Sequence, residues 1–197
     1  MLQDRGAETE PPARIVVGLG NPGARYARTR HNAGFMALEA LARELGGAWC
    51  MGPLSRICRI GLGGARVLLV EPLTYMNLSG EALVGLLSAF RREPRDLLLV
   101  VDDLNLPFGR IRIRERGSAG GHRGLESVLR CLNTEEIVRV RMGIGEDPMP
   151  EDKAEFVLSD FPQHAQAELD AMILRAGNAI RSVVSEGVSK TMAMFNA

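Results

Sequence analysis

The feature of the sequence that most constrains the fold is an apolar run followed by two adjacent aspartates. Residues 96–101 read DLLLVV, and Asp102 and Asp103 follow directly. A strand with almost no polar position must be buried on both faces, which suits the centre of a sheet with parallel pairing. In such sheets, ligands bind beyond the carboxyl ends of the strands. The two carboxylates therefore stand where α/β proteins place functional groups.

The rest of the chain alternates between strand-like and helix-like segments. Short apolar or alternating runs indicate strands, and apolar residues spaced three and four apart indicate helices. We expect strands at 14–19, 56–60, 66–70, 96–101, 110–114 and 139–144, helices at 33–45, from 79, from about 122 to 132 and at 165–185, and a short linker at 156–161. This order predicts a single α/β domain at 14–197, with helices on both faces of one mixed, twisted sheet. Residues 1–13 are polar and Pro-containing, and we expect them to form a disordered extension.

Composition excludes several classes of protein. The formal net charge is zero, so no overall field favours nucleic acid or a membrane surface. No apolar run approaches the roughly 18 residues that span a bilayer. The three cysteines form no CxxC pair, which argues against a disulfide framework and a zinc site and for a reducing compartment. We expect a cytoplasmic monomer.

The first strand ends in a glycine-rich turn that invites a nucleotide-binding interpretation. Residues 18–23 read GLGNPG and fit the dinucleotide pattern GxGxxG. Pro22 removes an N–H that could hold a phosphate, and the following residues do not begin an apolar helix. A nucleotide-dependent enzyme is therefore only a weak hypothesis for this chain. The turn is better explained as a means of placing His31.

His31 and one of the two aspartates form a candidate catalytic pair. If the two strand ends meet, an imidazole and a carboxylate face solvent together, and that pair can activate a water molecule. Adjacent strand residues point to opposite faces, so only one aspartate can reach His31. A metal site at Asp102, Asp103 and Asn105 is an alternative without further ligands of obvious spacing. Asn77, in the turn before the helix at 79, could bind an anionic oxygen or a peptide group.

Arginines alternate with isoleucines at 110–114, which gives this strand one basic and one apolar face. Arg114 lies on the basic face, and Arg141 comes from the next predicted strand. Such a face is often only solvated. Beside the glycines at 117–121 and a helix N-terminus, it could instead bind phosphates.

Taken together, the motifs resemble those of one family, the bacterial-type peptidyl-tRNA hydrolases. The matching stretches occur in the same order over about residues 14–161: VGLGNPGARYARTRHNAGF, EPLTYMNLSG, VVDDLNLPFGRIRIRERGSAGGHRGL, VRMGIG and FVLSDF. The resemblance implies a single α/β domain that cleaves the ester between a peptide and the 3′ end of tRNA. It implies no metal or other cofactor, and peptidyl-tRNA as the partner.

The resemblance also implies roles for individual residues. His31 matches the general base and Asp102 its carboxylate partner. The positions implied to contact the peptide or position water are Asn21, Tyr26, Tyr75, Met76, Asn77 and Arg123. Arg114 and Arg141 match positions that bind tRNA phosphate.

The chain departs from the family pattern beside His122. The family commonly has Asn after this histidine, and this chain has Arg123, which donates hydrogen bonds but cannot accept them. Arg123 could still contact a peptide carbonyl, the ribose or a phosphate. The main alternative function is a non-catalytic RNA-binding protein of the same fold, which the Arg123 change mildly favours and the retained His31, Asp102 and Asn77 disfavour.

Overall fold

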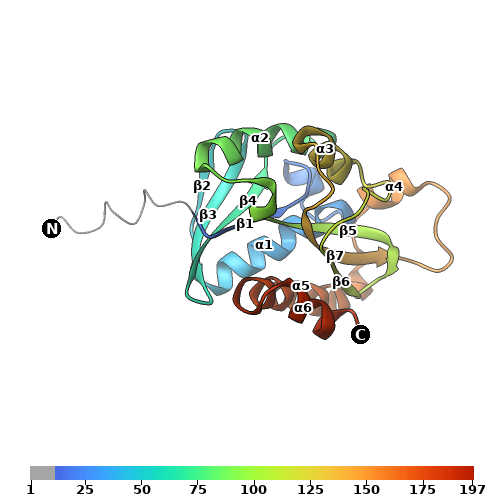
Figure 1. The fold of residues 1–197 in the computed structure, drawn as a ribbon. Coiled ribbons are helices and arrows are strands. Elements are labelled where there is room, and N and C mark those ends of the chain that lie inside the picture. The colour runs from blue at the N-terminus through green and yellow to red at the C-terminus, as the bar shows by residue number, and fades with distance from the viewer. Residues whose placement is uncertain (1–11) are drawn as a thin grey trace.

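In the computed structural model, which describes residues 12–197, seven strands form one mixed sheet (Figure 1). The sheet has the order β2-β3-β4-β1-β5-β7-β6. The strands are β1 (Arg14–Gly18), β2 (Trp49–Gly52), β3 (Ser55–Leu62), β4 (Ala65–Pro72), β5 (Leu97–Pro107), β6 (Ile111–Arg114) and β7 (Val138–Gly145). The pairs β1–β4, β1–β5 and β5–β7 are parallel, and the outer pairs β2–β3, β3–β4 and β6–β7 are antiparallel. The parallel centre brings the carboxyl ends of β1, β4, β5 and β7 to one edge.

Helices cover both faces of the sheet, with α2 and α3 on one side and α1, α5 and α6 on the other (Figure 1). The helices are α1 (Ala33–Glu44), α2 (Ser79–Phe90), α3 (Arg123–Leu132), α4 (Lys153–Leu158), α5 (Gln166–Glu186) and α6 (Val188–Phe195). Short 3₁₀ turns lie at Ala24–Tyr26, Arg30–Asn32, Met76–Leu78, Pro94–Asp96 and Gln163–Ala165. None of the helices within residues 12–197 combines the length and apolar character that crossing a bilayer requires.

Alternating side chains of the central strands supply two separate cores. In β1, Val16 packs with α1 and α5, whereas Ile15 and Val17 pack with α2 and α3. Strands β4 and β5 divide in the same way. Burial of both faces explains why residues 97–101 are apolar throughout.

The predicted α/β fold, with one mixed sheet and helices on both faces, is confirmed. The hairpin predicted at 56–70 is β3–β4, and the alternating strand predicted at 110–114 is β6, in which Ile111 and Ile113 are buried. The prediction of a disordered extension at 1–13 falls almost wholly outside the described residues.

Two expectations were wrong: one about a segment between strands and one about where the central strand ends. The expected linker at 156–161 overlaps α4, whose cap is Asp152: the Asp152 carboxylate accepts hydrogen bonds from the backbone N–H groups of Ala154 and Glu155, both at 2.9 Å. The central strand does not end at Val101 but runs to Pro107, with an irregular register against β7 between Asp103 and Pro107. Asp102 and Asp103 therefore lie inside β5.

Candidate active site

A cavity of about 790 Å³ opens at the sheet edge where the carboxyl ends of the parallel strands lie. It is lined by the loops that follow β1 and β4, by residues 101–105 of β5, and by residues from β6, β7, α3 and α4. Every residue singled out from the sequence as a candidate site residue lines this cavity: Asn21, Tyr26, His31, Tyr75, Met76, Asn77, Asp102, Arg114, Arg123 and Arg141. The structure therefore brings the separate motifs into one place.

Two glycines let the start of α1 approach the sheet closely. A Cβ atom on Gly18 would lie 2.5 Å from the carbonyl oxygen of Gly34, and one on Gly34 would lie 2.4 Å from the carbonyl oxygen of Val100. Any side chain at either position would push α1 away from β1 and β5. The close approach places the turn at Arg30–Asn32, and with it His31, against the middle of β5.

His31 and Asp102 form a buried hydrogen-bonded pair in this cavity. The Nδ1 atom of His31 lies 2.9 Å from Oδ1 and 3.0 Å from Oδ2 of Asp102. An ionised carboxylate only accepts hydrogen bonds, so Nδ1 of His31 carries the proton. The Nε2 atom then keeps its lone pair and can accept a proton. Asp103 points elsewhere and forms an ion pair with Arg141.

A second histidine, His122, binds the same carboxylate, and sequence reasoning assigned it no role. Its Nε2 atom lies 2.9 Å from Oδ1 of Asp102, while its Nδ1 atom accepts a hydrogen bond of 3.1 Å from the backbone N–H of Leu125. The second contact leaves Nε2 as the nitrogen that donates to Asp102. Its place after Gly120-Gly121, at the N-cap of α3, was the available signal in the sequence.

The three groups set each other's charge. Burial alone would raise the pKa of Asp102, but the adjacent His31 and His122 outweigh it and hold that pKa well below the usual range. Burial alone would lower the pKa of His31, but the Asp102 carboxylate overcomes it, so the pKa of His31 is raised. The positive charge of Arg123 opposes this rise. The pair is therefore a fixed carboxylate and an imidazole of increased basicity.

His31, Asp102 and His122 also have the residue types of a metal-binding cluster, with ligand atoms within 4.8 Å of one another. The hydrogen bonds account for this arrangement without an ion. A metal at Nε2 of His122 would need the lone pair of a nitrogen whose proton is fixed by the Leu125 contact. The chemistry that the arrangement supports is general acid–base catalysis.

A frame of asparagines positions the opposite side of the cavity. The side chain of Asn32 hydrogen-bonds both to the backbone N–H (2.9 Å) and to the backbone carbonyl (3.0 Å) of Asn21. The Oδ1 atom of Asn21 accepts a hydrogen bond of 2.9 Å from the backbone N–H of Met76. This contact fixes the orientation of the Asn21 amide and leaves its Nδ2 group as a donor toward a ligand. Asn77 and Tyr75 lie beside it and are exposed.

The basic side of the cavity comes from β6 and β7. Arg114 is half-buried, and Arg141 is held by Asp103. Arg139, on the same strand as Arg141, is buried, and its guanidinium donates to the backbone carbonyls of Ile137, Ser118 and Glu135 at 3.0–3.2 Å. Arg139 therefore stabilises the loop before α3, and it lines the cavity together with Arg114 and Arg141.

Arg30 ties the segment around α4 to the turn that carries His31. Its guanidinium donates to the hydroxyl of Ser159 (2.7 Å) and the carbonyl of Asp160 (2.8 Å), and it pairs with Glu146 at 2.9 Å. The same group lies 4.2 Å from the ring centre of Phe156. The buried Arg30 thus fixes one rim of the cavity, a role that the sequence did not reveal.

Known proteins match this chain over nearly its whole length. Residues 15–197 match the family model described as "Peptidyl-tRNA hydrolase". A peptidyl-tRNA hydrolase of Chloroflexus aggregans is 46% identical over 184 residues, which are 92% of this chain and 98% of the relative. One of Thermotoga petrophila is 44% identical over 183 residues, 93% of this chain and 97% of the relative.

Solved structures agree with this result. The crystal structure of peptidyl-tRNA hydrolase from Acinetobacter baumannii superposes with a TM-score of 0.86 at 34% sequence identity, and the match covers 95% of this chain and 96% of that one. The likeness therefore holds for the fold and for the sequence together.

Proposed function

Because the chain belongs to the peptidyl-tRNA hydrolase family, we propose that it hydrolyses the ester bond between a peptide, or an N-blocked amino acid, and the 3′ end of tRNA. The products are a peptide with a free carboxyl group and a tRNA with a free 3′ hydroxyl. Such an activity recycles tRNA from peptidyl-tRNAs that ribosomes release. The observation that carries the proposal is the His31–Asp102 pair, buried at the cavity with Nε2 of His31 left to accept a proton.

His31 acts as the general base on water. As the water oxygen attacks the ester carbonyl, Nε2 of His31 takes its proton, and Asp102 stabilises the imidazolium that forms. When the tetrahedral intermediate collapses, the bond to the 3′ oxygen breaks and that oxygen takes the proton from the imidazolium. General base catalysis of this kind contributes roughly 10²–10⁴-fold to the rate.

Amide donors complete the site. The Nδ2 group of Asn77, or that of Asn21, donates to the oxygen that becomes negative in the transition state, which is worth about 10²–10³-fold for one well-placed donor. Tyr26, Tyr75 and Met76 contact the peptide, and Arg123 contacts a peptide carbonyl, the ribose or a phosphate. Each of these residues lines the cavity.

The tRNA lies along the basic side of the cavity, where Arg114 and Arg141 bind its phosphates. Contacts of this kind fix the position of the nucleic acid without reading its sequence. The enzyme therefore accepts tRNAs of different sequence. A non-catalytic RNA-binding protein would need these arginines but not the buried His31–Asp102 pair.

The test is release of the blocked amino acid from N-acetyl-aminoacyl-tRNA by the purified protein, in the presence of a chelator and without added nucleotide. We expect turnover by the wild type, loss of turnover in His31→Ala with tRNA binding retained, and full activity in the control His164→Ala, because His164 is exposed and does not line the cavity. Near-wild-type rates in His31→Ala would remove His31 from the mechanism. No turnover by the wild type, with tRNA still bound, would favour the non-catalytic alternative.

A further inference from the structure

An uncharged part of the surface adjoins the cavity on the side away from Arg114 and Arg141. Residues 51–55 (MGPLS) form the β2–β3 turn, and residues 72–80 (PLTYMNLSG) connect β4 to α2; neither segment contains a charged residue. In a chain with 24% charged residues this is unusual. The two segments are joined, since Leu73 donates a backbone hydrogen bond of 2.8 Å to the carbonyl of Leu54, and Ser55 pairs with Pro72 across β3 and β4.

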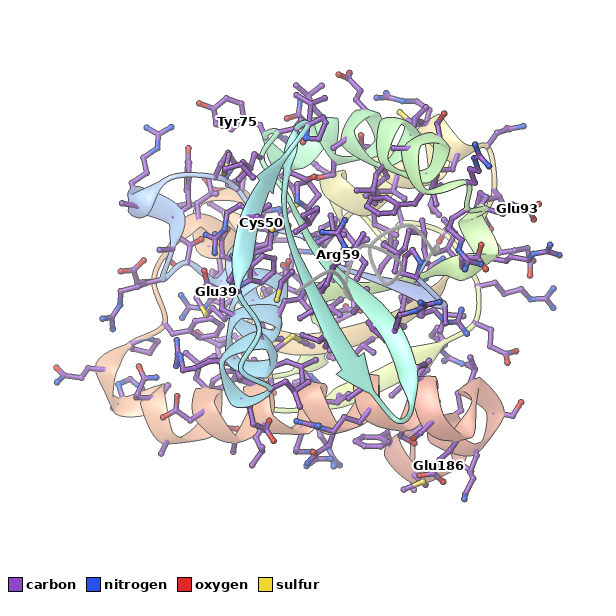
Figure 2. The ribbon with its side chains drawn as sticks, turned by 90° about the vertical axis from the view of Figure 1, so that its left-hand side faces the viewer. Glu39, Cys50, Arg59, Tyr75, Glu93 and Glu186 are labelled. Atoms are coloured by element: carbon purple, nitrogen blue, oxygen red, sulfur yellow. The ribbon has the colours of Figure 1, made fainter. Side chains whose placement is uncertain are left out.

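These two segments expose large apolar side chains, which we call the hairpin surface: Met51, Leu54, Tyr75 and Leu78, with exposed fractions of 72%, 58%, 54% and 36%. Figure 2 shows the labelled Tyr75 side chain projecting outward at the end of the sheet where β2 and β3 join. Tyr75 also lines the cavity. The hairpin surface is therefore an outward continuation of the cavity wall.

Leu54 occupies an unfavourable position in this surface. Its φ angle is 53°, in the left-handed region that glycine and asparagine adopt with less strain. Its side chain is mostly exposed, so packing within the protein does not compensate for the strain. The tight turn between the paired residues Gly52 and Ser55 imposes this angle, so a leucine here adds an exposed apolar side chain where asparagine would fit the backbone better.

We propose that the hairpin surface binds the peptide part of the substrate beyond the residue that carries the ester, and that it favours apolar, uncharged peptides. This inference rests on the proposed function. A peptide of several residues attached at the ester extends past the cavity, because each extended residue adds about 3.3 Å. RNA is excluded as the occupant because the hairpin surface offers no cation for phosphate. The cavity then has a basic side for tRNA and an uncharged side for peptide.

The experiment compares two substrates on the same tRNA: one carries a single N-acetyl-amino acid and the other an N-acetylated apolar pentapeptide that ends in the same amino acid. The variant is Leu54→Asn, which suits the left-handed backbone and should fold at least as well as the wild type. The matched control is Leu174→Asn, an equally exposed leucine (60%) on α5. Melting temperatures of both variants confirm folding.

We expect Leu54→Asn to raise KM for the pentapeptide substrate about three- to tenfold, the effect of losing partial burial of one apolar side chain. KM for the single-residue substrate should stay the same, and Leu174→Asn should change neither. Equal changes for both substrates, or no change for the pentapeptide, would overturn the proposal. Loss of a dimer in Leu54→Asn by gel filtration, with unchanged kinetics, would assign the surface to self-association instead. If the wild type hydrolyses neither substrate, the proposed function itself fails.

Discussion

Two carboxyl groups lie fully buried in the central sheet, and only one of them is equipped for chemistry. Asp102 in β5 is 3% exposed, and Glu71 in β4 is fully buried. Asp102 accepts hydrogen bonds from two imidazoles, His31 and His122. Neither carboxyl oxygen of Glu71 accepts a hydrogen bond from any described residue, although Nε of Arg56 lies 3.5 Å from Oε2.

This difference shifts the pKa values of the two acids in opposite directions. Burial raises the pKa of Glu71 to about 8 against the attraction of Arg56, and the nearby Glu39 adds to the rise. The pKa of Asp102 is lowered because the two imidazoles that donate hydrogen bonds to it outweigh burial. At neutral pH, Asp102 is a carboxylate that can orient an imidazole, whereas Glu71 is a neutral acid. The number of hydrogen-bond donors, rather than depth, distinguishes the candidate site from the core.

Replacing Asp102 should have the largest effect. Asp102→Asn keeps the shape of the side chain but removes the charge that fixes the His31 tautomer and stabilises its protonated form. We expect kcat to fall roughly 10³–10⁴-fold while tRNA binding persists. Steady-state kinetics and a filter-binding assay measure the two effects. Asp103→Asn, which alters the neighbouring carboxylate without touching His31, should cost far less, and equal losses in both variants would refute the distinct role of Asp102.

Removing the second donor to Asp102 should have an intermediate effect. His122→Asn retains a good N-cap for α3 but is too short to reach Asp102 while it caps the helix. We expect kcat to fall by up to about 10²-fold with KM little changed, because the Asp102–His31 pair loses part of its support. An unchanged kcat would show that one imidazole alone keeps Asp102 in place.

Glu71→Gln should leave the rate unchanged and alter stability instead. The pKa of Glu71 is about 8 in the folded protein and near its ordinary 4.5 in the unfolded chain. The wild type should therefore lose stability relative to the variant as pH rises from about 4.5 to 8, by about 1.4 kcal/mol per pH unit. Denaturant unfolding of both proteins at several pH values measures this difference. A constant difference across that range would mean that Glu71 is already ionised when folded.

The fold followed largely from the sequence because its periodic signals are strong. The apolar strand at 97–101 and the alternating Arg112–Ile113–Arg114 segment lie where predicted. The short helix α4 was missed, since six residues carry little periodic signal and its cap, Asp152, resembles an ordinary turn residue. Helix α6 was missed as well, because it depends on tertiary contacts. Its last turn is followed by Asn196, whose side chain hydrogen-bonds to both backbone groups of Ile113 in the edge strand β6.

The site was only partly predictable. The motifs identified the residues that line the cavity, but which of Asp102 and Asp103 meets His31 depends on strand orientation, and the resemblance to a family made that choice. His122 and Arg30 act through contacts distant in sequence, with Asp102 and Ser159, that no local pattern encodes. Glu71 looks in sequence like any strand carboxylate, and its lack of donors is a property of the packed structure alone.

The most direct test of the account is the titration of His31 by ¹⁵N NMR, in the wild type and in Asp102→Asn. In the wild type we expect the neutral imidazole to carry its proton on Nδ1 and to titrate above the ordinary 6.5, and we expect the variant to lose the raised pKa. A wild-type His31 that titrates at or below 6.5 with its proton on Nε2 would contradict the claim that Asp102 prepares His31 to act as a base.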